Sequence, residues 1–170
     1  MVLGICKKYP YFYLHLVMEL LKFKLPQSQK IYDTAISDGM PELLSRFLVG
    51  QAKHESGNYK SKFAKNYNSY FGYSYNKKSV WQMPKGGTNA DNGVPIASYR
   101  SIEDSTHEVT HWIKRRQKEG RFPKDLGTIT TPMQYAKLLQ DCGYYQGWKK
   151  YTKEENLNFY AKGIENGMKE

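Results

Sequence analysis

The sequence contains no long hydrophobic run. Its most apolar stretch, residues 11–25, is interrupted by charged side chains and is shorter than the roughly 20 apolar residues that a membrane-spanning helix needs. The same stretch lacks the small residues that mark a signal-peptide cleavage site. We therefore expect no transmembrane segment. We interpret residues 1–26 as a helical extension that packs on the main domain, residues 27–170. A membrane-surface or uncleaved export segment is the alternative for the extension.

Cysteine is scarce, with only Cys6 and Cys142 in a chain of 170 residues. A chain of this length buries enough hydrophobic surface to fold without covalent links. A disulfide scaffold of the kind found in small secreted proteins is therefore not needed, and both cysteines are expected to be free, buried thiols. The sequence also has no internal repeat and no low-complexity tail.

Acidic residues are outnumbered: 16 Asp and Glu stand against 26 Lys and Arg, which gives a net charge of +10. This charge favours an anionic partner, such as a cell-wall polymer, a nucleic acid or a membrane surface. No nucleic-acid-binding motif is present, so a nucleic acid is not expected as a partner. Aromatic residues are plentiful by contrast, with 15 tyrosines, and a flat ring with a polar edge stacks well on a sugar or a base.

Helix signals predict a mainly helical domain. Capping residues, prolines and apolar spacing predict five helices, at residues 27–37, 41–55, 101–116, 131–143 and 152–164. Residues 79–83 and 94–99 alternate apolar and polar side chains around a Gly- and Asn-rich turn, which predicts one small β-hairpin. Residues 58–76 are expected to form a polar, aromatic loop. The predicted fold class is therefore mainly α, with a small β-hairpin lobe (α+β).

Glu55 is the strongest catalytic candidate in the chain. It continues a three- and four-residue spacing of apolar or small side chains formed by Leu44, Phe47, Leu48, Gln51 and Ala52. Its carboxyl group should therefore point inward, where loss of water favours the protonated form. Gly57 is expected to end this helix, so Glu55 also lies near the negative end of the helix dipole, which acts in the same direction. A protonated carboxyl group is what a general acid requires.

Five short motifs follow one another in a recognisable order. They are GQAKHESG at 50–57, NSYFGY at 68–73, SYRSIEDS at 98–105, CGYY at 142–145 and FYA at 159–161. In this order and spacing the chain resembles the peptidoglycan-hydrolysing glucosaminidase family, which includes flagellar-rod and autolysin endo-β-N-acetylglucosaminidases. The resemblance covers about residues 31–164. It implies a lysozyme-like fold in which the hairpin lies beside the active-site cleft.

The resemblance also implies roles for particular residues. The glutamate of the first motif is the family's catalytic acid and corresponds to Glu55. The second motif shapes the cleft and corresponds to Asn68, Phe71 and Gly72, and the tyrosine after the glycine of CGYY lies at the sugar site and corresponds to Tyr144. Tyr70, Phe71, Tyr73 and Trp81 are further candidates for stacking on sugar rings.

The second catalytic group is less well defined. Many family members carry a second glutamate on the hairpin, and this sequence has none there. Asp91 lies closest to the expected distance and is the candidate for that role. Breaking a glycosidic bond needs a proton for the leaving oxygen, expected from Glu55, and stabilisation of the oxocarbenium-like sugar. Three agents remain open for this stabilisation, namely Asp91 activating a water, Asp91 as nucleophile, or the substrate's own 2-acetamido oxygen. Tyr144 is expected to orient the acetamido group or the water.

The expected function is hydrolysis of the β-1,4 glycan of bacterial peptidoglycan at N-acetylglucosamine. The alternatives are a muramidase or lytic transglycosylase on the same substrate, and a catalytically weak cell-wall-binding structural protein of a virion. No cofactor and no metal are expected, because His107 and His111 have a metal-binding spacing but lack a third ligand. We expect a monomer. It should act on the wall from outside the cell, in the periplasm or as a phage lysin, although the sequence has no clear export signal.

Overall fold

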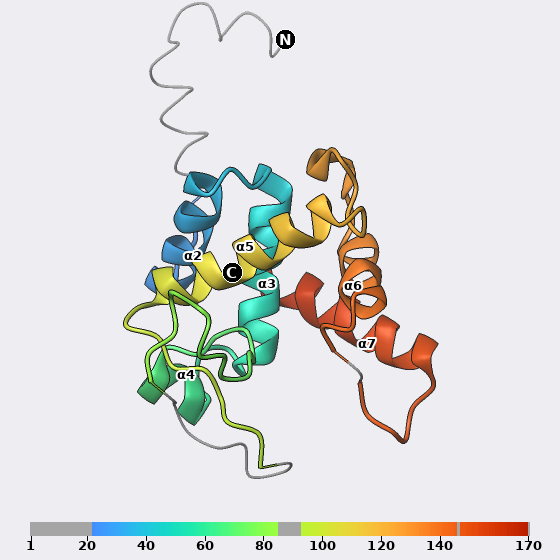
Figure 1. Ribbon diagram of the computed structural model, residues 1–170. Coiled ribbons are helices and arrows are strands. Elements are labelled where there is room, and N and C mark those ends of the chain that lie inside the picture. Colours follow the sequence, from blue (N-terminus) through green and yellow to red (C-terminus); the bar gives the residue numbers. More distant parts are fainter. Residues whose placement is uncertain (1–21, 85–92, 146, 170) are drawn as a thin grey trace, which may run out of the picture.

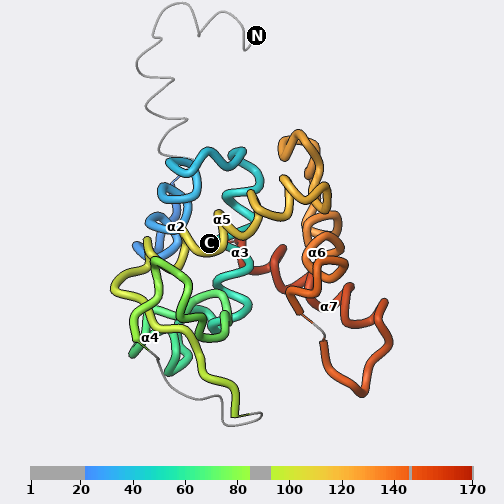
Figure 2. Tube along the Cα trace, in the orientation of Figure 1, coloured from blue at the N-terminus to red at the C-terminus, as the bar shows by residue number. Residues whose placement is uncertain are grey.

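The computed structural model describes residues 22–84, 93–145 and 147–169 (Figures 1 and 2). These residues form six α-helices and one short 3₁₀-helix: α2 (Pro26–Ser37), α3 (Glu42–Glu55), α4 (Lys62–Tyr67), α5 (Ile102–Lys118), η1 (Leu126–Thr128), α6 (Pro132–Asp141) and α7 (Lys153–Gly167). The prediction of a mainly helical domain is confirmed. The predicted N-terminal extension falls mostly on residues 1–21, which lie outside the described residues, as does Cys6.

Helices α5, α6 and α7 begin where the sequence places their capping residues. The Ser101 side chain accepts a hydrogen bond from the backbone N–H of Asp104 at the start of α5. Thr131 and Thr152 each form a complete capping box at the starts of α6 and α7. Such caps satisfy backbone N–H groups that have no partner inside the helix, which explains why the predicted starts agree with the observed ones.

Helix α3 occupies the middle of the molecule (Figure 1). Helix α2 lies on one side of it and helices α6 and α7 lie on the other, while α5 begins beside α2 and crosses α3 in this view. Its core side chains, all at most 1% exposed, are Leu44, Phe47, Leu48, Val49 and Ala52. The apolar stripe that predicted an inward-facing Glu55 is therefore the central packing surface of the domain.

The contact between α3 and α7 depends on glycines. A Cβ atom added at Gly50 would lie 2.2 Å from the carbonyl oxygen of Ile164, and one at Gly167 would lie 2.5 Å from the carbonyl oxygen of Gly50. A Cβ atom at Gly163 would meet the His54 ring at 2.2 Å. The two helix backbones can approach this closely because these positions have no side chain. This close approach brings the residues of α7 next to the end of α3.

The predicted β-hairpin is wrong for the described residues, which contain no strand. Segment 95–99 instead makes isolated antiparallel bridges to two different partners, one between Ser74 and Ile96 and one between Gln82 and Tyr99. Its flanking hydrogen bonds are divided in the same way between residues 73–75 and residue 83. Because neither pairing continues, no ladder forms. Pro95 also lacks the N–H that a regular ladder would use. The expected turn, residues 85–92, lies outside the described residues.

The segment predicted as a loop, residues 58–76, contains the short helix α4. The Ser61 side chain caps its start by accepting from the N–H of Ala64 at 3.1 Å. Its end is set by Asn68, which adopts a left-handed conformation with φ 49°. A helix of six residues is too short to give a periodic pattern, which is why the sequence did not reveal it. No helix among the described residues is both long and apolar enough to cross a membrane.

Candidate active site

Glu55 is the last residue of α3, and the chain turns sharply after it. Gly57 has a positive φ of 57°, and Ser56 fixes the turn through its hydroxyl group. That hydroxyl donates to the carbonyl oxygen of Ala52 at 2.5 Å and accepts from the N–H of Tyr59 at 2.9 Å. The position of Glu55 is therefore set by both the helix and the turn that ends it.

A tyrosine of α7 holds the Glu55 carboxyl group. The hydroxyl of Tyr160, which is only 6% exposed, donates a hydrogen bond to Oε1 of Glu55. The Tyr160 ring is itself held by parallel stacking on Tyr145, with 3.9 Å between the ring centroids. Burial raises the pKa of Glu55, and the Tyr160 hydrogen bond opposes this by lowering it. The larger of the two effects is burial, so the site favours a protonated Glu55.

Gly72 lies near the other oxygen of the same carboxyl group. A Cβ atom at Gly72 would lie 3.3 Å from Oε2 of Glu55, and its φ of +64° also favours glycine. The preceding residue, Phe71, offers its carbonyl oxygen to the hydroxyl group of Tyr144. Tyr144 thus fastens the 71–72 backbone beside the acid, and its own ring packs edge-on against Tyr73 with centroids 5.5 Å apart.

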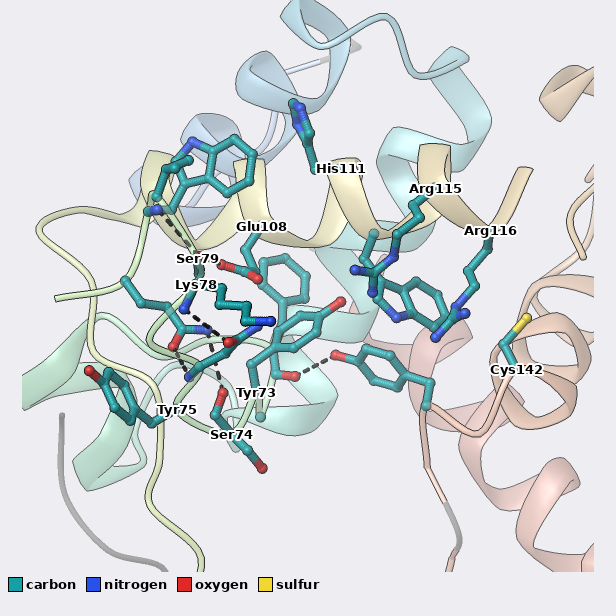
Figure 3. Close-up of a pocket in the computed structure, with 18 of the residues that line it drawn as sticks. Tyr73, Ser74, Tyr75, Lys78, Ser79, Glu108, His111, Arg115, Arg116 and Cys142 are labelled. Carbon is teal, nitrogen blue, oxygen red and sulfur yellow. Dashed lines mark hydrogen bonds between the residues drawn. The ribbon is translucent and has the colours of Figure 1, made fainter. Parts of the chain in front are cut away.

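Glu55 lines one hollow, and a second hollow is lined by the neighbouring Gly72. The smaller cavity, of about 400 Å³, is lined by Glu55 together with Tyr145, Trp148, Phe159 and Tyr160. The larger cavity, of about 710 Å³, is lined by Gly72, Tyr73, Trp81 and Tyr144, among others (Figure 3). Gly72 lines the larger cavity, and a Cβ atom built on it would lie 3.3 Å from Oε2 of Glu55, which lines the smaller one. The two hollows therefore lie near the same carboxyl group.

The tyrosines around Glu55 are held in their neutral form. Burial raises the pKa values of Tyr135, Tyr144 and Tyr160 far above the ordinary tyrosine value, and the electrostatic effect of Glu55 in its ionised form acts in the same direction. Each hydroxyl therefore remains a hydrogen-bond donor. The Tyr135 hydroxyl donates a hydrogen bond to Oε1 of Gln51 at 2.6 Å, and the Tyr160 hydroxyl donates one to Glu55.

The structure brings some of the predicted site residues together and not others. Gly72, Tyr73, Trp81 and Tyr144 line the larger cavity beside Glu55. The Phe71 side chain also borders this cavity, but it is only 1% exposed and belongs to the core.

Asn68 and Tyr70 have contacts that serve the scaffold. The Asn68 amide donates to the carbonyl oxygens of Tyr99 and Arg100, at 3.1 Å each, which ties α4 to the start of α5. Tyr70 is 6% exposed and packs edge-on against Tyr59. Asp91 lies outside the described residues.

Sequence reasoning assigned no role at the site to Tyr160, Tyr145 or Trp148. Tyr160 lies on the apolar stripe of α7, and a buried tyrosine hydroxyl needs a partner, so the stripe together with the buried Glu55 contained a usable signal. Tyr145 lies in the CGYY motif next to Tyr144. Trp148 is 54% exposed in a loop, and no sequence pattern identifies it.

The histidines take part in packing. His54 lies between α3 and α7, with its ring edge-on against Tyr160 at 5.0 Å, and burial lowers its pKa. His107 Nδ1 lies 2.8 Å from Oδ2 of Asp38, and His111 packs on Trp81. In the described part of the chain, no three side chains of the metal-binding types come together. Cys142 is a partly buried free thiol whose pKa is raised by burial.

A mainly helical domain with a partly buried carboxyl group, whose pKa is raised by burial and which lines an aromatic-rich hollow, has the features of a glycoside hydrolase. The family comparison agrees with this class: the glucosaminidase model, described as mannosyl-glycoprotein endo-beta-N-acetylglucosaminidase, matches residues 39–170. The chain therefore belongs to the glucosaminidase family, whose members are glycoside hydrolases that act on peptidoglycan. The resemblance inferred from the five motifs is confirmed.

One solved structure shares the fold. It is a chain from a type VI secretion system effector-immunity complex of Pseudomonas protegens, with a TM-score of 0.54 and 18% sequence identity. The match covers 82% of this chain and 86% of the other. At this identity the match shows the fold alone. No curated protein sequence matches the chain.

Proposed function

We propose that this protein is an endo-β-N-acetylglucosaminidase that hydrolyses the β-1,4 glycan of bacterial peptidoglycan, with Glu55 as general acid. The observation that carries the proposal is the environment of Glu55. Its carboxyl group opens into a cavity, accepts a hydrogen bond from Tyr160, and has a pKa raised by burial. A carboxyl group that holds its proton in this way can deliver it to the glycosidic oxygen as the bond breaks.

The sugar left behind needs stabilisation as positive charge develops on it. Among the described residues that line the smaller cavity, Glu55 is the one carboxyl group, so no neighbouring carboxylate is available there as nucleophile. We propose that the 2-acetamido oxygen of the substrate attacks the anomeric carbon, since an N-acetyl sugar carries this group in reach of its own C1. Asp91 remains a candidate for activating the water that completes hydrolysis or for acting directly.

Tyr144 is proposed to act by positioning. Its hydroxyl donates a hydrogen bond to the carbonyl oxygen of Phe71. This hydrogen bond fixes the backbone of Gly72 beside Glu55. Tyr73, Trp81 and Trp148 are proposed to contact sugar rings, because they line the two hollows and present aromatic surface. We further propose that residues 27–170 form the catalytic unit, which agrees with the extent of the family match.

The test compares wild type with Glu55→Gln and, as a matched control, Glu165→Gln. Glu165 is an exposed residue of α7 that pairs with Lys169. On purified peptidoglycan in a zymogram and a turbidity assay, Glu55→Gln should lose at least about a hundredfold in rate, whereas Glu165→Gln should clear the wall as wild type does. Near-normal clearing by Glu55→Gln would contradict the role of Glu55.

Product analysis decides the linkage. After borohydride reduction, mass spectrometry should find reduced N-acetylglucosamine ends. Reduced muramic ends would indicate a muramidase, and anhydro ends a lytic transglycosylase. Absence of products from every wall tested, with wall binding retained, would favour a structural wall-binding protein.

A further inference from the structure

The larger cavity carries more positive charge than neutral sugars require. Arg115 and Arg116 of α5 lie along one wall, and Lys78 lies across from them (Figure 3). Both arginines face one carboxyl group, Glu119: Arg116 Nη1 lies 2.5 Å from Oε2, and Arg115 Nε lies 4.0 Å from Oε1. Two guanidinium groups with one carboxylate leave an excess positive charge at this wall.

The same cavity contains hydrogen-bond donors with spare capacity. Arg116 Nε is buried, and within the described residues it has no hydrogen-bond partner. The buried hydroxyl of Tyr73 likewise has none there. Tyr73 lies close enough to both Arg115 and Glu108 for their charges to act on its hydroxyl group. Such buried donors are costly unless a ligand or water satisfies them.

The lining of the larger cavity also includes one carboxyl group, that of Glu108. Glu108 lines the cavity on the same helix as the arginines and accepts a hydrogen bond from the Ser79 hydroxyl. Figure 3 shows its carboxyl group near Ser79, at a distance along α5 from Arg116. The two arginines and Glu108 therefore lie at different points along α5, and the cavity volume of about 710 Å³ has room for more than one sugar ring.

We propose that the larger cavity binds the stem peptide of peptidoglycan, with Arg115, Arg116 and Lys78 holding its carboxylates. This inference rests on the proposed function. In a glycan whose N-acetyl sugars carry their lactyl groups in amide linkage to a peptide, the sugars are neutral and the carboxylates belong to the peptide. Guanidinium groups recognise carboxylates through paired, charge-assisted hydrogen bonds, which explains their presence beside a sugar site. The Glu108 region suits the ammonium group of a dibasic stem residue.

The test measures binding with the Glu55→Gln protein, so that no ligand is consumed. Three ligands are titrated calorimetrically: soluble glycan strands with stem peptides, the same strands after an amidase has removed the peptides, and chitin oligosaccharides. Stem-bearing strands should bind on the order of tenfold more tightly than either other ligand. Adding Arg115→Gln and Lys78→Gln together should remove most of this preference. Arg116 is left in place because it also packs over Trp112 at 5.3 Å.

The matched control replaces Lys118 and Lys124 by glutamine, which removes the same charge from exposed positions that do not line the cavity. This control should keep the preference for stem-bearing strands. A preference lost equally in the control would mean general charge attraction and would overturn the proposal. Equal binding of stem-bearing and peptide-free strands would also overturn it, because the free lactyl carboxylate would then suffice.

The two proposals fail in different ways. Wild type that cleaves no strand overturns the glucosaminidase function, as measured by product analysis. Wild type that cleaves stem-bearing and peptide-free strands at the same rate, while Glu55→Gln binds them equally, leaves that function standing and overturns the peptide site. Thermal unfolding of each variant confirms that it is folded before binding is compared.

Discussion

Three separate parts of the chain surround the carboxyl group of Glu55. Helix α3 directs the side chain inward, Tyr160 of α7 donates to one carboxyl oxygen, and Gly72 lies against the other. Burial favours the neutral acid, whereas the Tyr160 hydrogen bond favours the anion. The pKa of this group is therefore a balance of two opposing effects, and each can be changed separately.

The pH dependence of activity should respond to Tyr160. A general acid works while it is protonated, so kcat/KM should fall as pH rises through the pKa of Glu55, which burial has raised above the usual glutamate range. Tyr160→Phe removes the hydrogen bond that lowers this pKa. The alkaline limb of the kcat/KM profile should therefore move to higher pH.

The control for this shift is Tyr145→Phe. Tyr145 stacks on Tyr160, but its hydroxyl is directed at the carbonyl oxygen of Ala136 and not at Glu55. Its removal should leave the alkaline limb in place. A limb that stays fixed or moves to lower pH in Tyr160→Phe would show that this hydrogen bond does not stabilise the Glu55 anion.

Gly72 offers a second test at the scale of one residue. Gly72→Ala would place a methyl group 3.3 Å from Oε2 of Glu55, so we expect kcat to fall about tenfold or more, because the carboxyl group must move. Gly93→Ala is a close control: its φ of +68° imposes a similar backbone strain, but no atom of the described residues lies within 4 Å of the new methyl group. Both variants should lose about 1–2 kcal/mol of stability, and only Gly72→Ala should lose activity in steady-state assays.

At the scale of elements, the site depends on how closely α7 approaches α3. Gly50, Gly163 and Gly167 permit this approach, and α7 carries Tyr160 to Glu55. The acid and its partner are 105 residues apart in sequence, so the contact exists only when the two helices are packed together. Stability of the helix pair and integrity of the site are therefore linked.

Gly50→Ala should disrupt this helix pair. The added Cβ would lie 2.2 Å from a backbone oxygen, which cannot move aside as a side chain can. Overpacking of this kind costs about 1–3 kcal/mol, which corresponds to a melting temperature lower by roughly 3–10 °C for a domain of this size. Lys162→Ala, on the exposed face of α7, should change the melting temperature by no more than about 1–2 °C. An unchanged melting temperature in Gly50→Ala would contradict the close contact.

The sequence predicted the elements that depend on local signals. The caps at Ser101, Thr131 and Thr152 act on the first turn of their own helices, so the pattern and the structure agree. The inward direction of Glu55 followed from the spacing of its own helix. The hairpin failed because pairing depends on distant partners, and segment 95–99 divides its bonds between two of them. The Tyr160 contact was missed for the same reason, since it requires the relative placement of α3 and α7.

At the scale of the whole molecule, the chain has a net charge of +10. Its basic side chains are not distributed evenly between the two cavities. The residues lining the smaller cavity include no lysine or arginine among those described, while the larger cavity contains Lys78, Arg115 and Arg116. We therefore expect the excess charge to act on the approach and binding of an anionic substrate more than on the proposed proton transfer from Glu55. Long-range attraction of this kind is screened by salt.

Salt should slow hydrolysis of an anionic wall. Raising ionic strength from about 10 mM to about 150 mM shortens the Debye length from roughly 30 Å to 8 Å. The initial rate of wall clearing should then fall several-fold, with the loss appearing in KM. Hydrolysis of neutral chitin oligosaccharides should change much less. Equal sensitivity of both substrates to salt would contradict a role for the net charge in substrate capture.

Helices and connecting segments contribute different parts of the site. The proposed proton donor and its tyrosine are carried by α3 and α7, whereas much of the surrounding wall comes from the non-helical segments 71–82, 142–145 and 147–148. Substitutions in these connecting segments should therefore change the lining of the two hollows while leaving the hydrogen bond between Tyr160 and Glu55 in place.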